Sequence, residues 1–312
     1  MLSSIFGNSK PINYIIILGF LALFYVLVGW ERMTGLHTAS DILVFVLALS
    51  VLLFSIMVVN FIVKRNQITG SNDYAILFFS LLIVLFHEVL LDYNAIMGNF
   101  FLLLALRRLI SLKSLKNIKL KLFDASFWIA VGSLFYDWML LYIVLVYISL
   151  YIYEPKNIRN WLVPIIAMAC AAILIYSVRI ISGDAGFIED HYSFEAIRNS
   201  NILANPGGSV KMLIYLILVV IAGIISFVRL GKLGMGKIVT MRLVVISFII
   251  GLLVTVLKSS EEAAPIMLTF FPASILFTKY IEVIKRANIK EVVLILSLVI
   301  PFMVFLAEWI AK

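Results

Sequence analysis

Residues 42–63 read ILVFVLALSVLLFSIMVVNFIV and contain no charged side chain. A helix rises about 1.5 Å per residue, so a run of this length can cross the ~30 Å hydrocarbon core of a bilayer. Ten further apolar runs lie on either side of it, at 12–30, 74–91, 93–106, 122–136, 138–153, 160–181, 210–228, 243–257, 265–284 and 291–310. The pattern predicts an all-α, polytopic transmembrane bundle of about eleven spans.

The composition supports a membrane protein over a water-soluble one. Of the 312 residues, 63% are hydrophobic and 13% are charged, whereas soluble domains are about 45–50% apolar and about 25% charged. The longest polar stretch, 182–209, is too short for a soluble domain, so we expect one transmembrane domain over residues 1–312. The first run has no small-residue cleavage site after it, which favours a retained span over a signal peptide.

Four of the runs are short, and two pairs of neighbours are joined at a single aspartate. Runs 74–91 and 93–106 meet at Asp92, and runs 122–136 and 138–153 meet at Asp137. Each pair forms either two full spans or one re-entrant hairpin, which a membrane tolerates where protein or water covers the backbone. Both alternatives leave the sidedness of the other runs unchanged.

The basic residues predict the orientation of the chain. With the N-terminus inside, roughly three quarters of the 25 Lys and Arg residues fall in inner segments, as the positive-inside rule requires. This arrangement, N-in and C-out, explains the net charge of +8 without a nucleic-acid partner. The basic segment 107–121 alternates cations with leucine and isoleucine, which is typical of a surface helix on an anionic cytoplasmic leaflet.

The acidic residues and the histidines gather on the opposite side. In the same orientation, more than two thirds of the 17 Asp and Glu residues and all three histidines lie outside. Since these side chains carry most acid–base and metal chemistry, the outer face is where we expect a site, if the protein has one.

The outer end of the third run holds the strongest candidates. His87 and Glu88 are followed by Asp92, and on a continuous helix Glu88 and Asp92 would share a face. This group suits a general base (Glu88, Asp92) or a metal ligand (His87), and it equally suits a helix end whose charges are solvated. The spacing is not the zinc signature His-Glu-x-x-His.

The first outer loop adds further candidates. Glu31 and Asp41 are possible catalytic carboxylates and His37 is a possible metal ligand, if the first three helices pack together. Asp41 or Ser40 can alternatively cap the helix that follows.

Three more outer residues are candidates for substrate binding. Asp137 lies between two aromatic residues, one of them Trp138, an arrangement that suits a sugar or a lipid headgroup as well as an ordinary turn. Arg179 can hold a phosphate or pair with an outer carboxylate. The loop 182–209 is either a lid with cation-binding side chains or a connector with a short interfacial helix.

Several chemistries are disfavoured by what the sequence lacks. It contains no Walker A sequence, no Gly-x-Ser-x-Gly elbow and no dinucleotide fingerprint. Its one cysteine, Cys170, permits no intramolecular disulfide. Which cofactor the protein uses, if any, is unknown from the sequence.

Three stretches carry a resemblance to known proteins: residues 1–13 (MLSSIFGNSKPIN), 103–116 (LLALRRLISLKSLK) and 122–136 (LFDASFWIAVGSLFY). They resemble an uncharacterised family of polytopic inner-membrane proteins of flavobacteria and their relatives, some of which are labelled carotene monooxygenases. That label implies iron held by four histidines, and this chain has three. The resemblance implies an inner membrane with a periplasm outside. The architecture also looks like that of membrane glycosyltransferases that use polyprenyl-phosphate sugars.

Three functions therefore remain open. The first is a subunit or scaffold of a cell-envelope or secretion assembly, with outer charges that are solvated or paired and other membrane proteins as partners. The second is a transferase for polyprenyl-phosphate lipids, with outer carboxylates that converge near the lipid. The third is a secondary transporter or flippase, with broken helices and a polar site at the membrane midplane. In each case membrane lipid surrounds the protein.

Overall fold

The computed structural model describes residues 2–30, 38–184, 186–192, 206–230, 235–258 and 265–310. These residues form helices and connecting turns, with no strand among them, as the sequence predicts. The elements are α1 (Leu2–Phe6), α2 (Pro11–Val28), α4 (Ala39–Arg65), α5 (Tyr74–Leu85), η1 (His87–Leu90), α6 (Tyr93–Ile110), η2 (Ser111–Ser114), α7 (Ile118–Gly132), η3 (Asp137–Tyr142), α8 (Ile143–Tyr153), α9 (Ile158–Ile181), α10 (Phe187–His191), α11 (Pro206–Leu230), α12 (Met235–Leu257), η5 (Pro265–Thr269), α13 (Phe270–Val283) and α14 (Ala287–Ile310).

Every predicted apolar run contains a helix, but the helices differ in length. Within the described residues, eight helical segments are long and apolar enough to cross a membrane. The runs 74–91, 122–136 and 138–153 yield shorter helices. In the first run the α-helix ends at Leu85, and in the second it ends at Gly132. In the third run the 3-10 segment η3 precedes the α-helix. The all-helical class is therefore confirmed, whereas only eight of the about eleven predicted spans correspond, within the described residues, to helices with the length and composition of a span.

Three 3-10 segments interrupt the apolar helices in one region of the bundle. The backbone leaves the helical region at Phe86, where φ is −114° and ψ is 56°, and η1 follows. Segment η5 touches η1 and lies along α6 and α12, and η3 also lies along α12. The breaks in three apolar segments are therefore neighbours in space.

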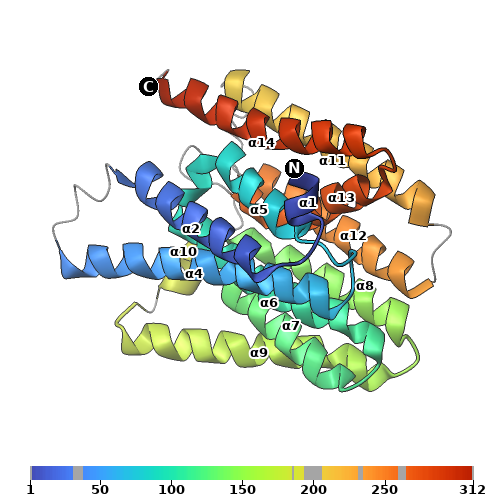
Figure 1. Cartoon of the computed structure of the whole chain (residues 1–312). Helices are drawn as coiled ribbons and strands as arrows, with labels where there is room; N and C mark the ends of the chain where they lie inside the picture. Colours follow the sequence, from blue (N-terminus) through green and yellow to red (C-terminus); the bar gives the residue numbers. More distant parts are fainter. Residues whose placement is uncertain are drawn as a thin grey trace.

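The centre of the bundle is made by α5, α6, α12 and α13. In the span formed by η5 and α13, 72% of the residues are buried, against 17% in α9 and 17% in α14. Phe86 and Phe270 pack with ring centroids 5.8 Å apart, which fixes α5 against α13. In Figure 1, α14 and α11 run along one side of the bundle and α9 runs along the opposite side.

The outer helices expose apolar side chains that water would not solvate well. Leu23 of α2 is 75% exposed, Ile181 of α9 is 85% exposed and Val228 of α11 is 75% exposed. Monomeric soluble proteins rarely expose large contiguous apolar patches. Together with the eight long apolar helices, this surface identifies a membrane protein.

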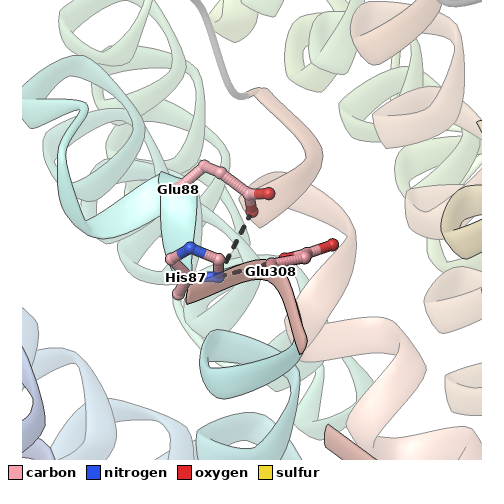
Figure 2. A group of neighbouring side chains, drawn as sticks. All are labelled: His87, Glu88 and Glu308. Carbon is pink, nitrogen blue, oxygen red and sulfur yellow. Dashed lines mark ion pairs between the residues drawn. The ribbon is translucent and has the colours of Figure 1, made fainter. Parts of the chain in front are cut away.

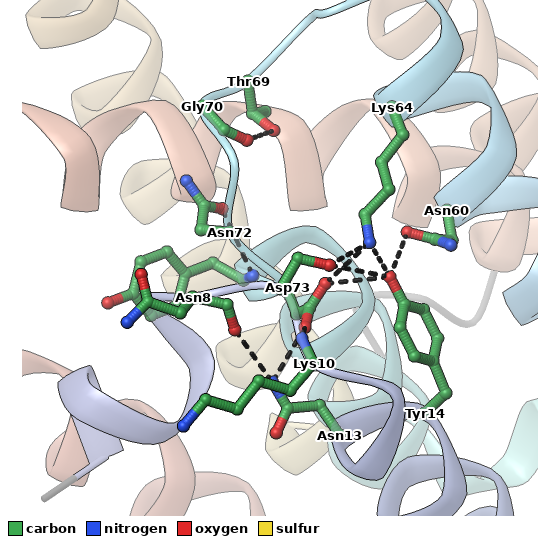
Figure 3. A network of polar contacts seen from close by, with 12 residues as sticks. Asn8, Lys10, Asn13, Tyr14, Asn60, Lys64, Thr69, Gly70, Asn72 and Asp73 are labelled. Carbon is green, nitrogen blue, oxygen red and sulfur yellow. Dashed lines mark hydrogen bonds and ion pairs between the residues drawn. The ribbon is translucent and has the colours of Figure 1, made fainter.

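A polar network lies at the start of α5, where Asp73 is buried between the N-terminal segment and α4 (Figure 3). Its Oδ2 accepts hydrogen bonds from the Asn13 side-chain amide at 2.8 Å and the Lys10 backbone N–H at 3.1 Å. Its Oδ1 accepts one from the Tyr14 hydroxyl at 2.9 Å and pairs with Lys64 Nζ at 3.2 Å. One carboxylate thus ties α2 and α4 to the start of α5.

The basic segment 107–121, expected as one surface helix, is instead the hairpin between α6 and α7. It contains the end of α6, η2 and the start of α7. Leu115 and Asn117 both have a φ of 52°, a left-handed conformation that interrupts the helix. Arg108 pairs with Asp124 at 2.8 Å and so joins the two helices across the turn.

Candidate functional site

His87 lies at the centre of a charged group that three distant parts of the chain assemble. The break at Phe86 places His87 at the first position of η1, where only 2% of its surface is exposed. Its ring meets the edge of the Phe305 ring of α14 at a centroid distance of 5.0 Å. The imidazole is therefore held between η1 and α14.

Two carboxylates approach this imidazole. His87 Nδ1 lies 3.5 Å from Glu308 Oε2 and 4.0 Å from Glu88 Oε2. Figure 2 shows the two carboxylates reaching the ring from different elements, Glu88 from η1 and Glu308 from α14. A carboxylate beside an imidazole orients the ring and stabilises its protonated form.

Lys211 of α11 completes the group. Its Nζ donates to Glu88 Oε1 at 2.7 Å and to Glu308 Oε1 at 2.9 Å, and its side chain is only 9% exposed. We call His87, Glu88, Lys211 and Glu308 the His87 cluster. It holds two carboxylates against one permanent cation, so it carries excess negative charge whenever His87 is neutral.

Lys211 compensates the charge of Glu88. Its ammonium group donates to Glu88 Oε1 at 2.7 Å, so the carboxylate is held as a hydrogen-bond acceptor within the cluster.

The cluster also has the donor set of a cation site. His87, Glu88 and Glu308 each offer one ligand atom, and these atoms lie within 4.8 Å of one another. The Lys211 ammonium already supplies positive charge to both carboxylates. The predicted metal ligand His87 therefore has suitable neighbours, whereas His37 lies outside the described residues, as does Glu31.

Glu88 and Asp92 do not share a helix face, contrary to the expectation from their spacing. The helix is interrupted between them, and Asp92 is the N-cap of α6. Its Oδ1 accepts hydrogen bonds from Asn94 N at 2.8 Å and Ala95 N at 3.2 Å, and its Oδ2 accepts one from the Tyr136 hydroxyl. Asp92 fixes the position of Tyr136 and does not belong to the His87 cluster.

Asp137 is the most completely buried of the predicted site residues. It begins η3, has no exposed surface, and lies with Oδ1 3.3 Å from Lys258 Nζ at the end of α12. Trp138 follows it and packs against the hydrophobic core while half-buried. Asp137 and Trp138 thus lie beside Tyr136, which Asp92 holds.

Two other candidates have local structural roles. Asp41 takes part in capping α4, but the N-cap is Thr38 and not Ser40 or Asp41: Asp41 lies at the third helical position and completes a capping box with Thr38. Arg179 pairs with Asp184 at 3.2 Å, and its guanidinium lies 3.5 Å from the centroid of the Phe187 ring. In the described part of the loop after α9, residues Phe187–His191 form the short helix α10, which is compatible with both alternatives for this loop.

Sequence reasoning found His87 and Glu88 and missed Lys211 and Glu308. Lys211 lies at the start of the predicted run 210–228, and Glu308 lies near the end of the run 291–310. Only the packing of α11 and α14 against η1 brings the two residues together. Their one sequence signal is that a charged residue at the end of an apolar run needs a partner or water.

A search of curated proteins and a search of solved structures found no match to the chain. A family model does match, over residues 1–311, and its members are described as a family of unknown function, DUF6427. Because the match spans almost the whole sequence, the chain belongs to the family of unknown function DUF6427.

Proposed function

We propose that this is a multi-pass protein of a bacterial inner membrane, N-in and C-out, that transfers a group from a polyprenyl-phosphate lipid at the periplasmic surface. The proposal places the His87 cluster at the reaction centre. Basic residues concentrated on one side support the orientation. The short helices α5, α7 and α8 complete about eleven crossings if their 3-10 extensions are included.

The observation that carries the proposal is a carboxylate and a cation in direct contact beside a buried imidazole. Lys211 Nζ lies 2.7 Å from Glu88 and 2.9 Å from Glu308. Transfer of a sugar from a lipid phosphate needs a base that removes the proton of the acceptor hydroxyl and a cation that stabilises the leaving phosphate. Glu88 or Glu308 suits the first role, and Lys211 suits the second.

The transfer of the sugar requires no chemical group beyond the acceptor, the lipid-linked sugar and these side chains. The acceptor oxygen forms a bond to the anomeric carbon, the bond from that carbon to the phosphate oxygen breaks, and the acceptor proton passes to the carboxylate. The lipid phosphate leaves with the electron pair of the broken bond. His87, in contact with both carboxylates, stabilises their charge and can share the proton.

The surroundings of the cluster favour a substrate with an apolar tail. On α11, Leu213 is 58% exposed and Ile214 is 51% exposed, close in sequence to Lys211. On α14, Leu306 is 49% exposed and Ile310 is 82% exposed, on either side of Glu308. A charged group next to side chains that face lipid suits a substrate whose charged head lies at the membrane surface.

A second candidate is a subunit of a cell-envelope or secretion assembly, in which the same charges are structural. It is favoured by the pairing of described carboxylates within the chain: Glu88 and Glu308 with Lys211, Asp137 with Lys258, and Asp184 with Arg179. On this account the pairs fix the helices relative to one another and present a defined surface to a partner.

The deciding experiment is a transfer assay with purified protein in lipid nanodiscs. The substrates are polyprenyl-phosphate hexoses labelled in the sugar, and release or transfer of the label is measured. We expect turnover by the wild-type protein, and a rate at least about 100-fold lower for Glu88→Gln or Glu308→Gln, since general base catalysis contributes about 10²–10⁴-fold.

The matched control is Asp124→Asn, which removes a carboxylate from the ion pair with Arg108 far from the cluster. It should retain the wild-type rate. If no donor is turned over while the cluster variants lower only the melting temperature, the transferase proposal fails and the assembly subunit is supported.

A further inference from the structure

A second polar site lies at the start of η3. Asp137 has no exposed surface, and within the described residues neither of its carboxylate oxygens accepts a hydrogen bond. Lys258 Nζ, 3.3 Å from Oδ1, balances the charge, and Oδ2 has no donor among the residues that the structure describes. A buried acceptor that lacks a donor costs free energy, so Oδ2 is suited to receive a donor from outside the chain.

Aromatic residues flank Asp137 in the sequence, Tyr136 before it and Trp138 after it. Tyr136 is held by the hydrogen bond of its hydroxyl to Asp92 and packs against α6 at Gly98. A side chain at Gly98 would begin with a Cβ 3.3 Å from the Tyr136 ring, so glycine allows this close approach. Aromatic rings beside a carboxylate are the surroundings in which proteins hold polyhydroxylated groups, because the rings cover the C–H faces and the carboxylate accepts the hydroxyl protons.

Helix α10 is joined to the chain at Ser133, four residues before Asp137. His191 Nε2 lies 2.7 Å from the Ser133 carbonyl oxygen, and the Tyr192 hydroxyl lies 2.8 Å from Ser133 Oγ. At the other end of α10, Phe187 stacks beneath Arg179. Burial raises the pKa of the Tyr192 phenol, and it outweighs the hydrogen bond with Ser133, which lowers this pKa.

The two polar sites are linked through Asp92. Segment η1 begins at His87 and runs to Leu90, a rise of about 8 Å, and Asp92 follows two residues later with Tyr136 bound to it. Tyr136 is the immediate neighbour of Asp137. The chain thus connects the His87 cluster to Asp137 through Asp92 and Tyr136.

We propose that Asp137 accepts a hydroxyl hydrogen bond from a neutral, polyhydroxylated group, the sugar of the lipid-linked substrate, beneath α10. The inference rests on the proposed function for the identity of the lipid. We expect this bound group to be uncharged, because Lys258 already balances the charge of Asp137. Asp137 is thus a specificity-determining residue, while the His87 cluster binds the phosphate.

The test compares two probes on protein in nanodiscs: a polyprenyl-phosphate hexose and the same lipid phosphate without sugar. We expect the wild-type protein to bind the sugar-bearing lipid roughly tenfold more tightly, since one hydrogen bond to a charged group is worth about this ratio. Asp137→Leu should abolish this preference without weakening the binding of the bare lipid. Lys211→Met should weaken both lipids alike and keep the preference.

Two further variants keep the inference testable if Asp137→Leu does not fold. Asp137→Asn keeps the size of the side chain and should reduce the preference, and Tyr192→Phe should reduce it by loosening α10. Asp124→Asn should change neither affinity. The inference is overturned if the wild-type protein binds the two lipids with equal affinity, or if Asp137→Asn leaves the preference intact. Either result would indicate that a water molecule donates to Asp137.

If the wild-type protein binds neither lipid, the proposed function fails, and the sugar site is tested alone. A free hexose carrying a diazirine should cross-link to residues 133–142 or 187–192 in the wild-type protein and not in Asp137→Asn. Cross-links elsewhere, or cross-links that persist in the variant, contradict the inference.

Discussion

Asp73 shows how single residues hold this bundle together at the end opposite to η1. Burial would raise the pKa of its carboxyl group, but hydrogen bonds from Asn13, Lys10 and Tyr14 and the charge of Lys64 outweigh burial and lower the pKa. The unfolded chain has an Asp pKa of about 3.9. The folded state therefore favours the ionised form, and its stabilising effect is present above about pH 4 and lost as the pH falls through the lower folded pKa.

Asp73→Asn tests this effect. The substitution leaves donors of Tyr14 and Lys64 facing a neutral amide, so we expect the free energy of unfolding at pH 7 to fall by about 1–3 kcal/mol. The loss of stability on acidification below about pH 4 should also become shallower. Thermal unfolding in detergent between pH 7 and pH 3 measures both effects.

The control for Asp73→Asn is Asp184→Asn, which breaks the exposed pair with Arg179. Such pairs contribute about 0–1 kcal/mol, so its unfolding should stay close to that of the wild-type protein. Equal acid profiles for Asp73→Asn and the wild-type protein would contradict the assigned role.

The His87 cluster makes a second prediction at the scale of residues. Lys211→Met leaves Glu88 and Glu308 facing each other without a cation, so it should lower the melting temperature more than Glu308→Gln does. Combining the two substitutions should recover part of the loss. A double-mutant cycle should give a coupling of about 0.5–1 kcal/mol, since both carboxylates are partly exposed. Strictly additive effects would show that the ion pair is not formed.

At the scale of elements, the junction of α12 with η3 and η5 depends on Gly251. A Cβ at this position would lie 2.8 Å from the Tyr142 hydroxyl and 3.0 Å from Thr269 Cγ2. Tyr142 is fixed by its hydrogen bond to the Ser247 carbonyl, and Thr269 is bound by Tyr215. Neither side chain can therefore move easily to make room for an added Cβ at Gly251.

Gly251→Ala should destabilise the protein by about 1–3 kcal/mol, because overpacking forces the segments apart. The matched control is Gly19→Ala in α2, where an added Cβ meets nothing within 4 Å. It should stabilise the helix slightly, since alanine has the higher helix propensity. Chemical unfolding of both variants measures the difference, and equal destabilisation would show that η3 and η5 do not pack on α12 as described.

The elements also show what the sequence could and could not predict. Apolar length located every long helix, because burial in lipid depends on composition and length alone. Asp92 and Asp137 mark in the sequence where two pairs of apolar runs meet, near η1 and η3. The 3-10 conformation of η1, η3 and η5 was not predictable, because 3-10 and α segments are equally apolar here. The partners of His87 were not predictable, since Lys211 and Glu308 reach it only through tertiary packing.

At the scale of the whole molecule, the orientation can be measured with single cysteines. Cys170 is the only cysteine, so Cys170→Ser provides a background without thiols. Ser40 and Ser114 are both exposed, and the predicted topology places Ser40 on the outer side of the membrane and Ser114 on the inner side. Ser40→Cys should react with a membrane-impermeant maleimide in intact spheroplasts, and Ser114→Cys should react only after permeabilisation. The reverse pattern would invert the orientation and move the His87 cluster to the cytoplasmic surface.

The measurement that bears most directly on the central claim is the affinity of the protein in nanodiscs for a bare polyprenyl phosphate. If the His87 cluster binds the lipid phosphate, Lys211→Met should weaken binding at least about tenfold, the effect of losing one charge-assisted hydrogen bond. Asp124→Asn should bind as the wild-type protein does. Equal affinity for Lys211→Met and the wild-type protein would contradict the account and leave the cluster as a structural ion pair.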